Sequence, residues 1–259
     1  GAGQDSIDGG VGNDTIAWAW GDGIDVIDGG ADSDTFAITG HVNDSILRAT
    51  LVGGVLTSVL DMTLTNIEAV TADMQGGVDW LIYTTTEAIT ADLGAGSASG
   101  FSSLLNVENI ISGAGADNLT GSNAANKLDS GDGADVLRGG AGNDELVGGG
   151  GDDLLFGGTG NDIIRGQAGV DYVSYADETD AFFVTFNGQA NVRRNSAGAA
   201  VEDLLDGVEH FVGGQNDDTV LGNSINNIFY GYFGNDTLNG GGGNDVLDGQ
   251  AGDDILIGG

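Results

Sequence analysis

The chain has 259 residues, with 40 Asp and Glu against 6 Lys and Arg, a formal net charge of −34, 50 Gly and neither Pro nor Cys. This charge excludes a protein that binds nucleic acids or is drawn electrostatically to anionic membranes, because both surfaces are polyanions. Without Cys there are no disulfides, thiolate metal sites or cysteine nucleophiles. No apolar run is long enough to span a membrane. Since 40% of the residues are apolar, the chain can form a core, and its expected partner is a cation.

Residues 1–37 form the first block of a nine-residue repeat. Its clearest copies are 9–17 (GGVGNDTIA) and 29–37 (GGADSDTFA), with a more divergent copy at 20–28. Two inserted residues, Trp18 and Ala19, interrupt the spacing. The insertion breaks the register of this block.

Residues 38–111 contain no copy of the repeat. A hairpin is predicted where 48–52 meets 55–59 across Gly53 and Gly54. The segment shares short stretches with residues 175–212, such as 78–83 (VDWLIY) and 170–175 (VDYVSY). Both segments are predicted to be wider β-solenoid coils continuous with the repeats, and separate small β domains are the alternative.

Residues 112–174 hold seven consecutive copies without a gap, among them 139–147 (GGAGNDELV). In the second connecting segment, 175–212, Phe182, Val184 and Phe186 alternate before Asn187 and Gly188, which predicts another hairpin. The last block, 213–259, holds five copies. Five regions follow from this pattern: 1–37, 38–111, 112–174, 175–212 and 213–259.

The repeat has an apolar residue at its eighth position and Asp at its sixth. The eighth position is occupied by Ile7, Ile16, Ile27, Phe36, Leu119, Leu128, Leu137, Leu146, Leu155, Ile164, Val173, Val220, Phe229, Leu238, Leu247 and Leu256. One apolar residue in nine cannot form an amphipathic helix. Gly at positions one, two and four favours a tight turn, and the last three residues favour a short strand. Two units would close one 18-residue coil of an all-β, parallel β-roll, in which stacked coils bury the apolar residues.

The pattern G-G-x-G-x-D-x-U-x resembles the calcium-binding nonapeptide of RTX (hemolysin-type) proteins. Glycine-rich structural solenoids also repeat, but they do not require Asp at every sixth position. The resemblance implies a fold of three calcium-binding roll blocks joined by wider β-solenoid segments. It also implies that each Ca²⁺ lies between a turn and the same-side turn one coil later, held by carboxylates and backbone carbonyls.

About eight complete calcium sites are expected from this rule. The predicted pairs are Asp5 with Asp25, Asp14 with Asp34, Asp117 with Asp135, Asp135 with Asp153, Asp144 with Asp162, Asp153 with Asp171, Asp218 with Asp236, and Asp236 with Asp254. Asn126 with Asp144 and Asn227 with Asp245 each lose a carboxylate, so we expect these places to be weak or empty. Calcium would neutralise the stacked Asp rows, and the chain is expected to be largely disordered without it.

Several other residues have two interpretations. Glu68, Glu108 and Glu209 could close the ends of the rolls or bind further calcium, although solvated carboxylates at strand edges are the simpler interpretation. His41 and His210 are interpreted as structural or surface residues. Trp18, Trp20 and Trp80 could form a sugar-binding face, but packing over the solenoid is favoured. Arg193 and Arg194 could dock an acidic coil of a neighbouring molecule.

No motif for a zinc protease, serine hydrolase, nucleotide-binding loop or EF-hand is present, so we expect no enzymatic activity. Two function classes remain. One is a calcium-triggered folding module of a secreted, bacterial type I secretion protein, either alone or as the accessory roll of an enzyme whose catalytic domain lies elsewhere. The other is a surface-layer, adhesin or filament subunit that stacks end to end, with Asp5 and Asp14 of one copy completing half-sites at Asp245 and Asp254 of another.

Overall fold

The protein is described by a computed structural model over residues 3–186, 189–194 and 202–259, and every regular element in these residues is a β-strand. The chain divides into two compact units, residues 1–122 and 123–259. Within the described residues, no helix offers the length and apolar character needed to cross a lipid bilayer. The predicted all-β architecture is confirmed.

The first unit contains three sheets built mainly from parallel strands stacked one coil above another. Its largest sheet has the order β1 (Ser6–Asp8), β3 (Val26–Asp28), β7 (Met62–Thr65), β6 (Val55–Val59), β5 (Ile46–Val52), β9 (Trp80–Tyr83) and β13 (Asn109–Ile111). A second has β2 (Thr15–Ala19), β4 (Thr35–Thr39), β8 (Ala69–Asp73) and β12 (Ser103–Leu105). The third joins β11 (Ser97–Ala98), β10 (Thr90–Asp92) and β14 (Asn118–Thr120).

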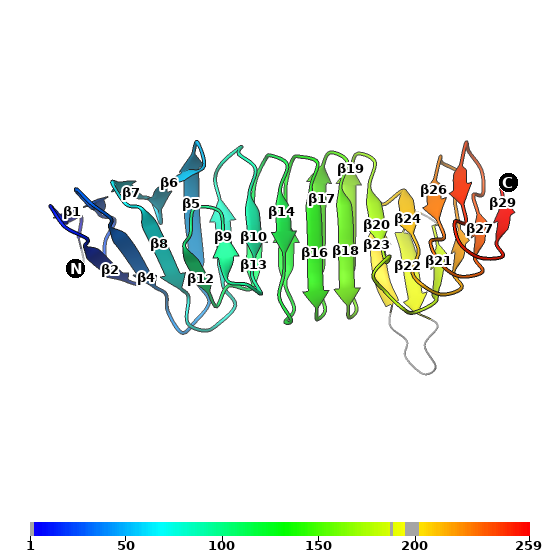
Figure 1. Cartoon of the computed structure of the whole chain (residues 1–259), viewed down its shortest axis with the longest axis horizontal. Helices are drawn as coiled ribbons and strands as arrows, with labels where there is room; N and C mark the ends of the chain where they lie inside the picture. The colour runs from blue at the N-terminus through cyan, green and yellow to red at the C-terminus, as the bar shows by residue number, and fades with distance from the viewer. Residues whose placement is uncertain (1–2, 187–188, 195–201) are drawn as a thin grey trace. The chain divides into compact units, whose positions relative to one another are not determined.

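The second unit has two sheets. One has the order β15 (Lys127–Asp129), β17 (Glu145–Gly150), β19 (Ile163–Ala168), β23 (Glu202–Asp206), β22 (Gln189–Arg194), β21 (Phe182–Thr185), β25 (Thr219–Leu221), β27 (Thr237–Asn239) and β29 (Ile255–Ile257). The other has β16 (Val136–Ala141), β18 (Leu154–Thr159), β20 (Tyr172–Ser174), β24 (His210–Val212), β26 (Ile228–Tyr230) and β28 (Val246–Asp248). Adjacent strands such as β16 and β18 lie side by side in parallel (Figure 1).

The connecting segments continue the same sheets, but they add antiparallel strands. In the first unit, β7, β6 and β5 form an antiparallel meander whose outer strands pair in parallel with β3 and β9. In the second unit, β23, β22 and β21 form an equivalent meander between β19 and β25. The Gly53–Gly54 hairpin is confirmed, with φ of 62° and 77° at the two glycines. Residues 187–188, the second predicted turn, lie outside the described residues, although the strands that flank them pair as a hairpin.

The repeats contribute a ladder of eighth-position side chains to the core of each unit, although Ile7 and Leu247 are half-buried and Leu256 is exposed. In the central block, Leu137 pairs with Leu155 on one sheet and Leu146 pairs with Ile164 on the opposite sheet, and all four are fully buried. Burial of such a side chain contributes about 1.5–3 kcal/mol. The same register recurs because the strand of every repeat supplies one inward residue, as the sequence pattern predicts.

The two-residue insertion at Trp18 and Ala19 forms the end of strand β2. Strands β2 and β4 pair over their full five-residue length, which includes Trp18 opposite Ile38. The coil therefore repeats every 20 residues here, where Asp14 N–H donates to Asp34 Oδ1, and every 18 residues in the central block. The insertion leaves both N-terminal aspartate pairs aligned, because a strand absorbs an even insertion without reversing which side chains face inward.

Candidate metal sites

The sixth-position carboxylates are linked into columns by the backbone. In each predicted pair within one unit, the main-chain N–H of the earlier residue donates to Oδ1 of the later Asp. The distances are 2.9 Å for Asp5 to Asp25, 2.8 Å for Asp14 to Asp34, 3.0 Å for Asp135 to Asp153, 2.8 Å for Asp144 to Asp162, 3.0 Å for Asp153 to Asp171, 2.8 Å for Asp218 to Asp236 and 2.9 Å for Asp236 to Asp254. This bond fixes one carboxylate oxygen of each later Asp and orients the other.

The same bond occurs where Asn replaces Asp. Asn126 N–H donates to Asp144 Oδ1 at 2.8 Å, and Asn227 N–H donates to Asp245 Oδ1 at 2.9 Å. Asp117 lies in the first unit and Asp135 in the second, so their contacts are described separately. Asp117 Oδ1 accepts the N–H of Ile89 at 2.7 Å. The columns therefore require only a backbone donor at the earlier position.

The second carboxylate oxygen, Oδ2, is the chemically notable atom of these columns. It is buried and accepts no hydrogen bond in the described part of the chain at Asp14, Asp34, Asp79, Asp144, Asp153, Asp171, Asp236 and Asp245. A buried carboxylate oxygen without a partner is costly, and a hard cation is its natural ligand. The donor set therefore fits calcium.

Backbone carbonyls line the same spaces. A Cβ placed on Gly139 would lie 2.4 Å from Asp144 Oδ2 and 2.5 Å from the carbonyl oxygen of Gly157, one coil later. On Gly231 it would lie 2.1 Å from Asp236 Oδ2 and 2.8 Å from Gly249 O. Only glycine at the first position leaves room between these oxygens. The turn is thus a cradle of one carboxylate and the carbonyls of adjacent coils.

Burial raises the pKa of several of these carboxyls. The pKa rises to about 6 for Asp144 and Asp171 and to about 7 for Asp153 and Asp218, in each case chiefly because burial disfavours the charged form. Hydrogen bonds from the backbone oppose this effect in all four. The ionised columns therefore need a counter-charge at neutral pH.

The columns bring carboxylates together as pairs and not as larger clusters. Among the described residues, no group of three or more His, Asp or Glu side chains is placed to hold a metal ion. This follows from the coil geometry, because each coil contributes one sixth-position carboxylate to a column and adjacent coils lie about 4.8 Å apart. The remaining donors to a cation would be backbone carbonyls, which Ca²⁺ accepts readily.

Three members of the columns have an Oδ2 with a protein donor. Ser112 Oγ donates to Asp117 Oδ2 at 2.5 Å, and the N–H of Gly214 donates to Asp218 Oδ2 at 2.8 Å. Tyr175 donates its hydroxyl to Asp203 Oδ2 at 2.8 Å. A protein donor at Oδ2 competes with a cation for that oxygen. These positions therefore differ chemically from those with an open Oδ2.

Sequence reasoning missed two members of the columns, both in the connecting segments. Asp79 Oδ1 accepts the N–H of Ser45 at 2.6 Å, and Asp203 Oδ1 accepts the N–H of Asp162 at 2.9 Å. Each is followed by the x-apolar-x strand pattern of the repeat, in 79–82 (DWLI) and 203–206 (DLLD). That shorter signature could have identified Asp79 and Asp203, but the five residues before each of them, MQGGV and GAAVE, do not follow the G-G-x-G-x pattern of the repeat.

Glu68 is exposed and Glu108 and Glu209 are half-buried, but all three bond the backbone of the preceding coil, which fits the interpretation that they close the ends of the rolls. Their Oε2 atoms accept the main-chain N–H of Asp34 at 2.8 Å, Asp79 at 2.8 Å and Asp171 at 3.1 Å. They therefore continue the columns into the connecting segments, where a shorter turn is bridged by the longer Glu side chain.

His210 and Trp18 pack within the solenoid. His210 is buried, its Nδ1 accepts the N–H of Ile228 at 2.8 Å, and its ring lies 4.5 Å from that of Tyr172. Burial lowers the pKa of His210. Trp18 is buried and makes an edge contact with Trp20, as the packing interpretation expected. The side chains of Arg193 and Arg194 lie outside the described residues.

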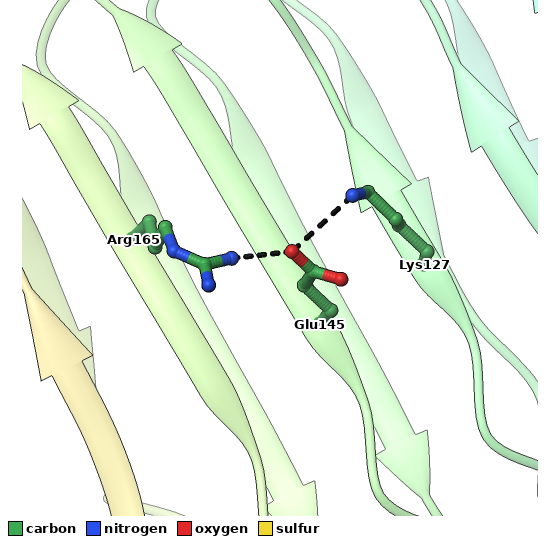
Figure 2. A network of polar contacts seen from close by, with 3 residues as sticks. All are labelled: Lys127, Glu145 and Arg165. Atoms are coloured by element: carbon green, nitrogen blue, oxygen red, sulfur yellow. Dashed lines mark hydrogen bonds and ion pairs between the residues drawn. The ribbon is translucent and has the colours of Figure 1, made fainter.

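A charged row crosses the outer face of the central block (Figure 2). Glu145 lies between Lys127, whose Nζ is 3.2 Å from Glu145 Oε1, and Arg165, which donates to the same oxygen. Burial raises the pKa of Glu145, but the hydrogen bonds and charges of Lys127 and Arg165 together outweigh burial, so the pKa lies below its ordinary value. This row joins Lys127, Glu145 and Arg165 on strands β15, β17 and β19 without using a column carboxylate.

Stacked parallel turns, each presenting a carboxylate to a glycine-lined space, define a cation-binding β-roll. The family model of the RTX calcium-binding nonapeptide repeat (4 copies) matches residues 1–17, 21–37, 111–146, 147–180, 205–238, 212–247 and 230–259. These ranges cover more than half of the chain, so the protein belongs to the RTX calcium-binding nonapeptide-repeat family. No curated protein matches the chain. The predicted β-roll and its calcium-binding repeats are confirmed.

Proposed function

We propose that the chain is a structural module of a secreted, extracellular protein that folds when calcium fills the spaces between its coils. One observation supports this best: Oδ2 of Asp144, Asp153 and Asp171 is buried and accepts no hydrogen bond from the described residues. In the absence of a cation, these carboxylates destabilise the stacked coils, and bound Ca²⁺ turns them into links between coils.

The proposed ligands are the sixth-position aspartates together with backbone carbonyls. They are Asp5, Asp14, Asp25, Asp34, Asp117, Asp135, Asp144, Asp153, Asp162, Asp171, Asp218, Asp236, Asp245 and Asp254. Extracellular modules bind Ca²⁺ with dissociation constants of about 10⁻⁴–10⁻³ M, and we expect this range here. An extracellular location fits that range, because such sites fill only where calcium is abundant.

We assign the module a structural role and not a catalytic one, because its buried carboxylates are already engaged with the backbone of adjacent coils. The decisive experiment is a calcium titration of the metal-free chain, followed by far-UV circular dichroism and by isothermal calorimetry. We expect β structure to appear together with calcium binding. A full β spectrum in excess chelator, unchanged by calcium, would exclude calcium-triggered folding.

End-to-end assembly is a second proposal for the same module. Light scattering with and without millimolar calcium separates the two, since a structural module within a longer protein stays monomeric and a filament subunit grows.

A further inference from the structure

Two columns continue beyond the last aspartate that the nonapeptide rule assigns to them. Asp34 ends its column in the N-terminal block and Asp171 ends one in the central block. In the next coil, the shortened turns Asn66-Ile67-Glu68 and Gly207-Val208-Glu209 take the place of a nonapeptide. Main-chain N–H groups of Asp34 and Asp171 donate to Oε2 of Glu68 and Glu209, at 2.8 Å and 3.1 Å.

Each junction contains an open carboxylate oxygen. Asp34 is 1% exposed and Asp171 is fully buried. Their Oδ2 atoms accept no hydrogen bond from any part of the chain that the structure describes. A carboxylate in this condition requires a cation or a proton. Both junctions therefore contain a buried Oδ2 that accepts no hydrogen bond from the described residues, as the columns within the repeats do.

Carbonyl oxygens face these carboxylates. A Cβ on Gly29 would lie 2.0 Å from Asn66 O and 2.7 Å from Asp34 Oδ2, and a Cβ on Gly166 would lie 2.2 Å from Gly207 O and 2.3 Å from Asp171 Oδ2. The left-handed φ of Asn66, 50°, and of Gly207, 64°, gives the two shortened turns a common backbone form. The same cradle has thus formed twice, once in each unit.

The glutamates add a second carboxylate to each junction. A hydrogen bond occupies Oε2, and Glu68 and Glu209 each have a further oxygen, Oε1, with its share of the charge. Two carboxylates and a carbonyl around a space that only glycine leaves open are the donor types that Ca²⁺ prefers. Magnesium fits less well, because it demands regular octahedral geometry and retains its waters.

We propose that Asp34 with Glu68, and Asp171 with Glu209, each form a calcium site outside the nonapeptide pattern. This inference rests on the proposed function, since it extends calcium binding to the junctions between repeats and connecting segments. At these junctions Glu is a calcium ligand supplied by a shortened turn. The two sites fix the connecting meanders to the adjacent rolls.

A third copy of the arrangement provides an internal contrast. Asp79 N–H donates to Glu108 Oε2, but the first position of this turn is Met74, which is completely buried. Gly29 and Gly166 hold that position at the two proposed sites. No glycine leaves the first position of this turn open, so the proposal is confined to the two junctions with glycine.

The test is the number of bound ions, measured by native mass spectrometry and calorimetry with calcium alone. Glu68→Gln and Glu209→Gln keep an oxygen for the N–H of Asp34 or Asp171 and remove the charge, so the fold is retained. We expect each variant to bind one Ca²⁺ fewer than the unaltered chain, and the double variant to bind two fewer. Asp61→Asn and Asp177→Asn change the charge equally at exposed positions, and we expect them to bind the full number.

An unchanged ion count and titration curve for both glutamine variants would overturn the proposal while leaving calcium-triggered folding intact. A chain that binds no calcium at all would overturn the proposed function itself. Because the two junctions lie in different units, a folding defect in one variant leaves the other to decide, and circular dichroism in saturating calcium identifies such a defect.

Discussion

Substitution of Gly148 by Ala tests whether the glycine cradle is required for the site. A Cβ there would lie 2.2 Å from Asp153 Oδ2 and 2.8 Å from its Cγ. The Asp153 carboxylate must therefore move, which breaks its bond to the N–H of Asp135 at 3.0 Å. An unsatisfied buried N–H costs about 1–3 kcal/mol, and overpacking adds about 1–3 kcal/mol. We expect a loss of about 2–6 kcal/mol of unfolding free energy in saturating calcium, and one Ca²⁺ fewer per chain.

The matched control is Gly150→Ala in the same turn. Its Cβ would approach only Oδ1 of Asp132, the end of an exposed side chain, at 2.8 Å. Neither Gly148 nor Gly150 has a left-handed φ, so backbone strain does not separate the two variants. Urea unfolding and calorimetry measure both effects. Equal stability and equal calcium counts for the two variants would refute the assignment of the cradle.

Three further predictions concern charge and packing. In chelator, we expect β structure to increase as the pH falls from 8 to 4, because the raised carboxyl pKa values, about 6 for Asp144 and about 7 for Asp153, make the folded state bind protons more tightly than the unfolded one. The stabilisation by protons is complete below about pH 3.8, the ordinary pKa of Asp, and is lost as the pH rises through 6–7. A circular dichroism titration that shows no gain of β structure on acidification would contradict this prediction. Leu155→Ala should cost about 2–5 kcal/mol in urea unfolding, since Leu155 is fully buried in the ladder, and a loss below about 1 kcal/mol would show that the coils close over the cavity. Glu145→Gln should lower the free energy of unfolding by less than about 1 kcal/mol for each of its ion pairs with Lys127 and Arg165, because these side chains are about a third exposed. The loss should vanish in 1 M salt, and a loss independent of salt would indicate a packing effect instead.

The core and the columns of the repeats could be predicted from the sequence because their period is fixed. Leu137, Leu146 and Leu155 are buried because each repeat supplies one inward side chain per strand. Constant spacing likewise aligns Asp135 with Asp153, and the structure joins them through a backbone hydrogen bond.

The junctions could not be predicted in this way, because the spacing changes there. Asp171 lies 38 residues before its partner Glu209, and Asp162 lies 41 residues before Asp203. An antiparallel meander between them removes the period from the sequence. Tyr175 and Asp203 come together only through this rearrangement. In these places the stacking of strands, and not the local pattern, decides which groups meet.

The hydrogen bonds within the columns all run in one direction along the chain. Asp144 N–H donates to Asp162 Oδ1, so the turn of an earlier coil is held by a side chain of the coil that follows it. The fifth-position side chains bond in the opposite direction, since Asn161 N–H donates to Asn143 Oδ1 and Val170 N–H donates to Asp152 Oδ1, both at 2.9 Å. Each coil therefore holds the turns of both its neighbours, the preceding one through its sixth-position side chain and the following one through its fifth-position side chain, so both ends of a stack offer bonding partners to an added coil.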